Sequence, residues 1–441
     1  MDKIKSSFCN LSPLPLFWQS LDNKMPGQML EKVVFLNDGI LSVDGQEIIL
    51  ESKVNILAYG KASRLMYETA KKIVGPEYFG RGILVTHENI NEISIDPLKE
   101  KFLMSTHPFI SELSAIAGEE VKQFVQKGEK LDVLLVLISG GGSAMVSLPI
   151  EEISLEDKIE FISDIMHASV PEREVNILKK ALSQIKGGKL AELSTTDLIV
   201  NCILSDERNH EVSAISSGMT VCNDLVNPLD VMDQYSLWNF ANERISKALR
   251  NHGEKRNIGC ENKFINSIIG SREDLIGELC RSANQFGFDT VHVLDTIHSC
   301  SPIEAVSLLV SEFESCYEKA EKGKHLVIST GEVQVKVDTS KPSKGGRNQH
   351  LIALLMLNFY PTYDFFICAI ATDGVDYLDG VHGAFYTKEH INMVNEKKEF
   401  ISDLVNKSNS FEIHKMIGSL LMGPKTGTNM SDFFLFSFNK T

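Results

Sequence analysis

Short apolar runs alternate with helically spaced segments along most of the chain. The clearest run is Val133–Ile138, six apolar residues between Asp132 and a glycine triplet. Such a run is typical of a strand buried on both faces of a parallel sheet. Similar runs in the first half are Val54–Tyr59, Gly82–Thr86, Phe102–Ser105 and Leu198–Leu204. Because helical patterns separate them, we predict a doubly wound, mostly parallel α/β sheet.

The second half repeats this alternation after a polar stretch at Glu243–Asn257, where we place the domain boundary. Its apolar runs are Phe264–Ile269, Thr290–Leu294, His325–Ser329, Val333–Val337, Phe365–Ala371 and Phe433–Phe438. A turn at Thr330–Glu332 between two of them predicts a hairpin, and hence a mixed sheet. At 441 residues the chain is too long for one core. We therefore expect a Rossmann-like domain, residues 1–250, and an α/β domain with a mixed sheet, residues 251–441.

Composition narrows the possible partners. The net charge of −15 argues against nucleic acid, since phosphate backbones select for excess Lys and Arg. A small anionic substrate in a locally basic site remains compatible. The eight cysteines form no CxxC pair, which fits reduced thiols in the cytoplasm better than a zinc site or a disulfide framework. No apolar run approaches the length of a membrane-spanning helix, so we expect a cytoplasmic protein without a membrane partner.

The most informative candidate site follows the strand at Val133–Ile138. Gly140, Gly141 and Gly142 allow the backbone to turn sharply and to approach a ligand closely. Ser143 then begins a segment that reads as a helix, whose free N–H groups suit an anion, above all a phosphate. The alternative is a glycine turn without a ligand.

Two other residues follow buried strands in the first half. Lys61 comes directly after Val54–Tyr59, and Asp206 comes after Leu198–Leu204. Ligands of open α/β sheets bind at the carboxyl edge of the strands, which is where both side chains are expected. Asp206 suits a metal ligand or a base, but it equally suits a helix N-cap. Lys61 could also be a solvated surface lysine.

The second half offers its own candidates. Gly345, Gly346 and Arg347 precede a helix, so a guanidinium fork and free N–H groups would meet a carboxylate or phosphate there. A solvated loop arginine is the alternative. Asp373 and Asp376 lie on a glycine turn after Phe365–Ala371 and suit a Mg²⁺ ion that keeps several waters. Turn-forming aspartates are the plainer interpretation.

The segment Gly423–Asn429, which contains Thr428 and Asn429, reads as a second loop for an anion or a sugar hydroxyl, or as a tight turn. Standard signatures are absent from the sequence: there is no Walker loop, kinase HRD or DFG, GxSxG, HExxH or GxGxxG.

Ten collinear motifs resemble the glycerate 2-kinase family, the class II glycerate kinases with a MOFRL C-terminal domain. They are GKAS at Gly60–Ser63, THP at Thr106–Pro108, LISGGGSA at Leu137–Ala144, IKGGKLA at Ile185–Ala191, ILSD at Ile203–Asp206, SSGMT at Ser216–Thr220, TGEVQVKV at Thr330–Val337, GGRNQH at Gly345–His350, ATDGVD at Ala371–Asp376 and TGTNMSD at Thr426–Asp432.

The resemblance implies an ATP-dependent kinase that phosphorylates the 2-hydroxyl of D-glycerate, with a divalent cation, in a cleft between two α/β domains. It implies catalytic roles for Lys61 and Arg347. With the strand-end argument, it makes Gly140–Ser143 the expected site of the nucleotide phosphates, assisted by Gly345, Gly346, Thr428 and Asn429. Asp206, Asp373 and Asp376 are the expected Mg²⁺ ligands, and Asp206 is the candidate for orienting the attacking hydroxyl.

Departures from the family pattern leave the acceptor open. They fall at residues 106–112, 179–183 and 207–220, and include Lys179 in place of the family's arginine, which removes a bidentate fork. Three alternatives follow: a kinase for another hydroxy acid or sugar acid, a catalytically degenerate binding or regulatory homologue, and hydroxypyruvate reduction, which the missing GxGxxG unit disfavours. The sequence also leaves open whether the protein is a monomer or a homodimer.

Overall fold

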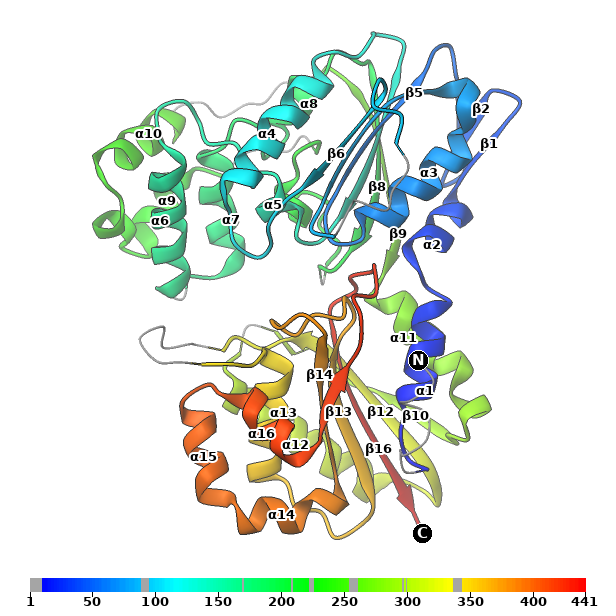
Figure 1. Ribbon diagram of the computed structural model, residues 1–441, viewed down its shortest axis with the longest axis vertical. Helices are drawn as coiled ribbons and strands as arrows, with labels where there is room; N and C mark the ends of the chain where they lie inside the picture. The colour runs from blue at the N-terminus through cyan, green and yellow to red at the C-terminus, as the bar shows by residue number, and fades with distance from the viewer. Residues whose placement is uncertain are drawn as a thin grey trace. The chain divides into compact units, whose positions relative to one another are not determined.

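The computed structural model describes residues 10–88, 95–168, 170–207, 209–221, 226–253, 261–295, 297–298, 300–335 and 343–441. The chain forms two compact units (Figure 1). Pro26–Ser271 make up the first, which we call the Rossmann-like unit. The segment up to Met25 joins Arg272–Thr441 in the second, the mixed-sheet unit.

The Rossmann-like unit is built on a fully parallel sheet. In chain order its strands are β4 (Val54–Tyr59), β5 (Phe79–Thr86), β6 (Glu100–Met104), β7 (Val133–Ser139), β8 (Leu198–Ser205) and β9 (Lys263–Ser271). Their spatial order is β6-β5-β4-β7-β8-β9, and each neighbouring pair is parallel. The chain therefore builds outward from β4 to one side, then returns to place β7 on the other. This is the strand order of the Rossmann fold.

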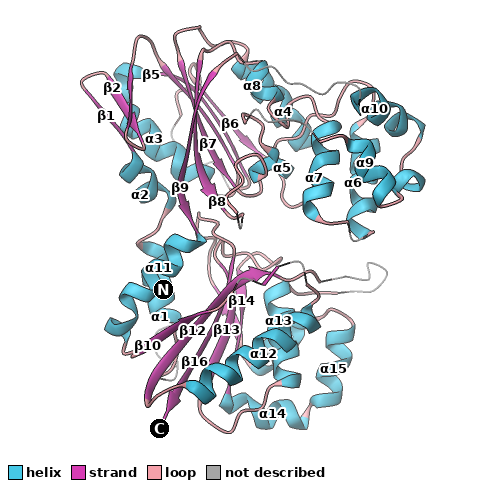
Figure 2. Cartoon of the chain, turned by 180° about the vertical axis from the view of Figure 1, so that it is seen from behind, coloured by secondary structure: helices cyan, strands magenta, loops and turns pink. Residues whose placement is uncertain are grey.

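Helices cover both faces of this sheet, which explains why its central strands are apolar along their whole length. Every residue of β4 and β7 is buried. One face carries α2 (Pro26–Val33) and α3 (Ser63–Tyr78), and the other carries α4 (Glu112–Val125), α5 (Gly142–Met145) and α8 (Lys189–Glu192) (Figures 1 and 2). A small antiparallel sheet, β1 (Val34–Asn37), β2 (Ile40–Val43) and β3 (Gln46–Ile49), lies on the side of α2 and α3 (Figures 1 and 2).

A helical lobe with its own apolar core extends from the α5 side of the unit (Figure 2). It contains α6 (Leu155–His167), α7 (Glu172–Ala181), α9 (Pro228–Gln234) and α10 (Glu243–Gly253). Its core includes Phe161, Ile165, Leu178 and Leu249, all almost fully buried. The lobe is inserted between β7 and β9 in sequence, so it is part of the crossover connections of the parallel sheet.

The mixed-sheet unit has strand order β10-β12-β16-β13-β14-β15, with β11 paired to β12. The strands are β10 (Thr290–Val293), β11 (Ile297–His298), β12 (Gly323–Glu332), β13 (Phe365–Ala371), β14 (Val381–Thr387), β15 (Leu420–Met422) and β16 (Asp432–Lys440). β10 and β11 are parallel to β12, and the other pairs are antiparallel. The predicted mixed sheet is therefore confirmed.

Helices lie on both sides of the mixed sheet (Figures 1 and 2). One side carries α12 (Pro302–Lys319), α13 (Arg347–Asn358), α14 (Ile391–Glu396), α15 (Lys398–Asn406) and α16 (Ser410–Ile417), and the other carries α1 (Leu14–Asp22) and α11 (Arg272–Ser282). Aromatic rings fill the core under α12 and α13: Phe313 stacks on Phe436, and Phe359 packs edge-on against Phe365. None of the helices in the described part of the chain has the length and apolar character needed to span a bilayer.

Two details of the expected organisation differ from the structure. The hairpin at Thr330–Glu332 is wrong: β12 continues through this turn signal as a single strand, and residues 333–335 form no strand. Residues 336 and 337 lie outside the described residues. The sheet is mixed because β16 runs antiparallel to β12 and β13 instead.

The compact units also divide the chain at Ser271, beyond the boundary at residue 250 expected from the sequence. The polar stretch at Glu243–Asn257 begins with α10, an amphipathic helix of the lobe that buries Ile245 and Leu249. The polar residues on the solvent-facing side of α10 give this stretch the composition of a linker, although it is a helix. β9, expected in the second domain, instead pairs along β8.

Candidate functional site

Lys61 and the glycine triplet meet at the point where the Rossmann-like sheet reverses its strand order. Lys61 follows β4 and Gly140 follows β7, and these two strands are neighbours. The Lys61 N–H donates to the Gly140 carbonyl at 3.0 Å, and the Ala62 N–H donates to Ser139 Oγ at 3.0 Å. Such a switch point, at the carboxyl ends of the strands, is where ligands bind in open α/β sheets.

Close packing explains why glycine occupies the end of the triplet. A β-carbon on Gly142 would lie 2.6 Å from both Ser216 Oγ and Tyr59 Cδ2. Gly141 has a φ of +85°, which favours glycine, and its Cα faces the Lys61 stem and the ring of His107. The loop therefore brings bare backbone, rather than side chains, beside Lys61.

Ser143 lies at the centre of a polar network that the sequence did not predict. Its hydroxyl is 2.8 Å from Ser217 Oγ and accepts a hydrogen bond of 2.7 Å from the ammonium of Lys186. Lys186 is fully buried, and its Nζ also donates to the Ser143 carbonyl. The IKGGKLA motif was the only sequence signal for Lys186, because nothing local links residue 186 to residue 143.

The expected helix after Ser143 is only one turn long, Gly142–Met145. A long helix dipole is therefore not available at this loop. In the described part of the chain, however, no acceptor takes the N–H groups of Gly142 and Ser143. These two donors and the nearby ammonium groups are the features that suit a phosphate.

Asp206 lies at the same sheet edge, one strand farther on. β8 is paired with β7 up to Ser139 and Leu204, and Asp206 follows the end of β8. Beside it, Ser205 Oγ is 3.0 Å from Nδ1 of His210. The carboxyl edge of one parallel sheet thus brings together Lys61, Gly140–Ser143 and Asp206.

Arg347 begins α13 in the mixed-sheet unit and is held by two carboxylates. Its Nε donates to Asp432 Oδ2 at 2.6 Å, and its Nη1 donates to Glu332 Oε2 at 2.7 Å. Asp432 is buried, and burial raises its pKa to about 7 against the lowering effect of the Arg347 charge. Burial acts to lower the pKa of Arg347, but the two carboxylates outweigh it and hold this pKa well above its usual value, so the guanidinium stays charged.

The two candidate aspartates of this unit differ in their surroundings. Asp376 is buried and caps α13, since its carboxylate accepts hydrogen bonds from the N–H groups of Asn348 (3.0 Å) and Gln349 (2.9 Å). Burial is the main reason why its pKa is raised. Asp373 Oδ1 accepts from the Val375 N–H at 2.9 Å, a turn-forming bond. Asp373 therefore makes the turn-forming bond of the plainer interpretation, whereas Asp376 caps a helix that lies 27 residues away in the chain.

The loop with Thr428 and Asn429 lies beside these aspartates. Thr372, which precedes Asp373, receives a hydrogen bond from Thr426 Oγ1 at its carbonyl and another from the Met430 N–H at its hydroxyl. The expected residues of the mixed-sheet unit thus gather around the start of α13 and the end of β13.

Several buried polar atoms in this group have no hydrogen-bond partner within the described part of the chain. They are both amide atoms of Asn348, Oε1 of Gln349 and Oγ1 of Thr428. Burying an unpaired amide is costly, so such atoms call for a polar ligand. Asn348 was not among the candidate residues from sequence, although it lies inside the GGRNQH motif.

No group of three or more His, Cys, Asp or Glu side chains capable of holding a metal ion occurs among the described residues. Magnesium is usually held by only one or two carboxylates, with waters and substrate phosphates as the other ligands. Asp206 or Asp373 fits that smaller requirement. Asp376 fits less well, since both of its oxygens already accept N–H groups.

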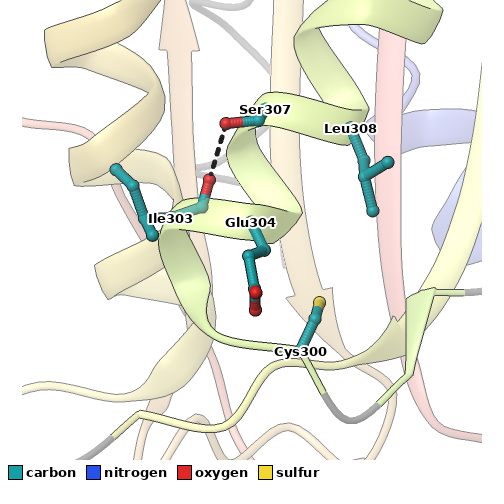
Figure 3. A pocket seen from close by; sticks show the side chains of 5 residues that line it. All are labelled: Cys300, Ile303, Glu304, Ser307 and Leu308. Carbon is teal, nitrogen blue, oxygen red and sulfur yellow. Dashed lines mark hydrogen bonds between the residues drawn. The ribbon is translucent and has the colours of Figure 1, made fainter.

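A hollow of about 560 Å³ lies beside the first turns of α12, but it lacks the groups that bind phosphate (Figure 3). Its lining residues are Cys300, Ile303, Glu304, Ser307 and Leu308, none of them cationic. Glu304 is already bonded to Ser301 in the capping box of the helix. The candidate functional residues are therefore those around Lys61 and Gly140–Ser143 in the Rossmann-like unit, and those around Arg347 in the mixed-sheet unit.

Comparison with known proteins identifies the family. Residues 14–250, more than half of the chain, match the family described as "Domain of unknown function (DUF4147)", and residues 325–432 match the MOFRL family. The chain is 27% identical to a glycerate 2-kinase of Pyrococcus horikoshii, covering 96% of both chains, and 26% identical to a D-glycerate 2-kinase of Thermotoga maritima, covering 87% and 90%.

Solved structures agree with this result at the level of the fold. A Pyrococcus horikoshii protein matches with a TM-score of 0.72 at 24% identity, and a Thermotoga maritima glycerate kinase with 0.76 at 23%; each match covers 97% of this chain and 98% of the other. The two-domain α/β fold is thus shared along the whole length. The chain belongs to the family that joins a DUF4147 domain to a MOFRL domain, the glycerate 2-kinase family.

Proposed function

We propose that this protein transfers the γ-phosphoryl group of ATP to the 2-hydroxyl of D-glycerate, giving 2-phosphoglycerate and ADP. The observation that carries the proposal is the junction of the Lys61 loop with the glycine triplet at the switch point of the parallel sheet. The chain that places them there resembles glycerate 2-kinases along nearly its full length.

Phosphoryl transfer depends mainly on positioning and on neutralising charge, so lysine, arginine and backbone N–H groups can supply most of the catalysis. We assign the N–H groups of Gly142 and Ser143, within the Gly140–Ser143 loop, to the nucleotide phosphates. Lys61 and Arg347 hold the transferring phosphoryl group and the substrate carboxylate. Asp206 orients the attacking hydroxyl.

In the mixed-sheet unit, Gly345 and Gly346 lead into α13, and Thr428 and Asn429 lie in the neighbouring loop. We assign them, with the unpartnered amide of Asn348, to polar atoms of the nucleotide or the acid. Arg347 then exchanges part of its ion pairing with Asp432 and Glu332 for a bond to substrate.

We further propose Mg²⁺ as the metal, held by Asp206 or Asp373 together with phosphate oxygens. A bound Mg²⁺ supplies charge neutralisation for the phosphates. Asp376, the third residue expected from the sequence, contributes by fixing the start of α13 through its two backbone hydrogen bonds. We also propose a cytoplasmic location, in line with the five free cysteines of the described residues.

The decisive experiment is an ADP-release assay of the full chain with ATP, Mg²⁺ and D-glycerate. Lys61→Ala and Arg347→Ala are each expected to lower kcat/KM by a factor of about 10² or more, the size typical of a lost transition-state contact. Lys127→Ala is the control, because Lys127 is exposed in the Rossmann-like unit. Near-normal turnover in the Lys61 variant would refute its role.

The second candidate is a kinase for another hydroxy acid or sugar acid. It is favoured by the departures from the family pattern at residues 106–112, 179–183 and 207–220. A substrate panel in the same assay separates the two functions by comparing kcat/KM between acids. ATP binding without turnover on every acid would instead indicate a binding or regulatory homologue. Light scattering of the same preparation would distinguish a monomer from a homodimer.

A further inference from the structure

Four lysines of the Rossmann-like unit lie close to one another near Ser143, and none of them has a counter-ion among the described residues. They are Lys158 on α6, Lys179 on α7, Lys186 in the loop before α8, and Lys189 at the first residue of α8, and we call them the lysine cluster. Lys158 and Lys186 are fully buried. In the part of the chain that the structure describes, the ammonium of Lys158 has no hydrogen-bond partner, and no ion pair joins any of the four to a carboxylate.

The four charges act on one another. Burial, together with the charges of Lys189 and Lys179, lowers the pKa of Lys158 to about 7. Burial lowers the pKa of Lys189 to about 8, and the pKa of Lys186 falls well below its usual value through burial and through Lys158 and Lys179. The carboxylates that oppose this effect are Glu172, which acts on Lys179, and Glu192, which acts on Lys189. They do not offset the burial.

The cluster is continuous with the proposed phosphate loop. Lys186 Nζ donates to both the hydroxyl and the carbonyl of Ser143. Ser217, whose Oγ lies 2.8 Å from Ser143 Oγ, donates to Asn176 Oδ1 on α7 at 2.6 Å, and α6 packs beside α7 (Figures 1 and 2). Like charges held together in a buried region repel strongly, because the surrounding dielectric is low. An anion with several charges would remove this repulsion, whereas an apolar or neutral ligand would not.

We propose that the lysine cluster is the subsite for the polyphosphate chain of the nucleotide, with Lys158 as a direct ligand of a phosphate oxygen. This inference rests on the proposed kinase function, and it adds four lysines to the glycine loop. Lys158 is the unpartnered donor that the anion satisfies, and Lys186 links that anion to Ser143.

The test is calorimetric titration of the full chain with ATP–Mg²⁺, with inorganic tripolyphosphate and with adenosine, at pH 8 in two buffers of different ionisation enthalpy. Since an anion restores the charge of Lys158 and Lys189, binding of both phosphate probes is expected to take up roughly one to one and a half protons per chain. Adenosine is expected to take up none. Binding of ATP but not tripolyphosphate, without proton uptake, would overturn the inference.

Lys158→Met and Lys179→Met identify the lysines responsible, with exposed Lys127→Met as the control. Lys158→Met is expected to weaken tripolyphosphate binding by about 10- to 100-fold, the loss of a charged hydrogen bond, and to reduce the proton uptake. It is also expected to raise the thermal unfolding temperature of the unliganded protein, because a buried amine without a hydrogen-bond partner among the described residues is removed. A purely structural lysine would show the opposite: lower stability with binding unchanged.

These experiments can refute the lysine cluster and the kinase function independently of each other. A chain that binds tripolyphosphate with proton uptake but phosphorylates no acid supports the lysine cluster and refutes the kinase function. A chain that phosphorylates D-glycerate but whose Lys158 and Lys179 variants bind both phosphate probes like the control refutes the lysine cluster alone. Lys179 is partly exposed, so its variant stays informative if Lys158→Met does not fold.

Discussion

Replacing Arg347 by alanine perturbs an ion pair whose two carboxylates differ in burial. The side chain of Asp432 is 3% exposed and that of Glu332 is 47% exposed. An exposed pair contributes about 0–1 kcal/mol, so Glu332 matters little. Asp432 would be left buried without its partner, which costs about 3–5 kcal/mol in a fully buried pair. Because Arg347 itself is about one-third exposed, we expect a loss of about 2–3 kcal/mol in the free energy of unfolding.

The loss of stability in Arg347→Ala is expected to depend on pH, because the Asp432 carboxyl group can take up a proton. Burial already raises the pKa of Asp432 to about 7, and removal of the arginine raises it further. Asp432 can then take up a proton in the variant, at a cost of about 1.4 kcal/mol for each pH unit above its pKa. The penalty of Arg347→Ala is therefore expected to be larger at pH 8 than at pH 6. Urea unfolding followed by circular dichroism at both pH values measures it.

A double variant separates the structural role of Arg347 from its role in catalysis. In Arg347→Ala/Asp432→Asn the buried charge is gone, so most of the lost stability is expected to return, while kinase activity stays low. Glu332→Gln is the matched control and should change stability by less than about 1 kcal/mol. Unchanged stability in the single variant would refute the ion-pair argument, and recovery of activity in the double variant would refute the catalytic assignment.

Three further predictions concern packing, an unpaired amide and acid stability. Gly142→Ala is expected to cost about 1–3 kcal/mol and to raise the KM for ATP, since its β-carbon would overlap Ser216 and Tyr59; unfolding and kinetics at wild-type values would contradict the tight packing. Asn348→Leu is expected to raise the unfolding free energy of the unliganded protein by about 1 kcal/mol or more while lowering kcat/KM; a destabilised variant would show that the amide has a structural partner. Burial lowers the pKa of His414 to about 4, from an unfolded value near 6.5. The neutral buried ring therefore contributes its full stability above pH 6.5, and about 2 kcal/mol of the free energy of unfolding is lost between pH 8 and pH 5. His414→Asn should reduce this dependence of the unfolding free energy on pH in urea titrations, and an unchanged dependence would assign it to other groups.

The parallel sheet could be predicted because its central strands are buried on both faces. Val54–Tyr59 and Val133–Ile138 are apolar along their length and end in glycine turns, and both are strands as expected. The order of the strands was not contained in these local patterns. The turn signal at Thr330–Glu332 misled for a similar reason: pairing of β12 with β16 stabilises an extended backbone through Thr330. Long-range pairing overrides a local turn preference.

The same holds for the site: residues at strand ends could be predicted from sequence, whereas residues brought in by tertiary packing could not. Positions directly after buried strands, such as Lys61 and Gly140, could be located from sequence, because the carboxyl ends of parallel strands share one edge. Lys158 could not, because it lies on an amphipathic helix where a lysine normally reads as a solvated residue. Its burial comes from the packing of α6 within the lobe.

The burial of Lys158 is informative because the packing of α6 does not require a charged side chain at this position. An apolar side chain at position 158 would fill the same volume without the cost of desolvating an ammonium beside Lys179 and Lys189. Folding therefore gains nothing from this lysine, whereas binding a polyanion does, since each bound negative charge offsets repulsion already present in the free protein. Stability and binding should consequently change in opposite directions when Lys158 is replaced.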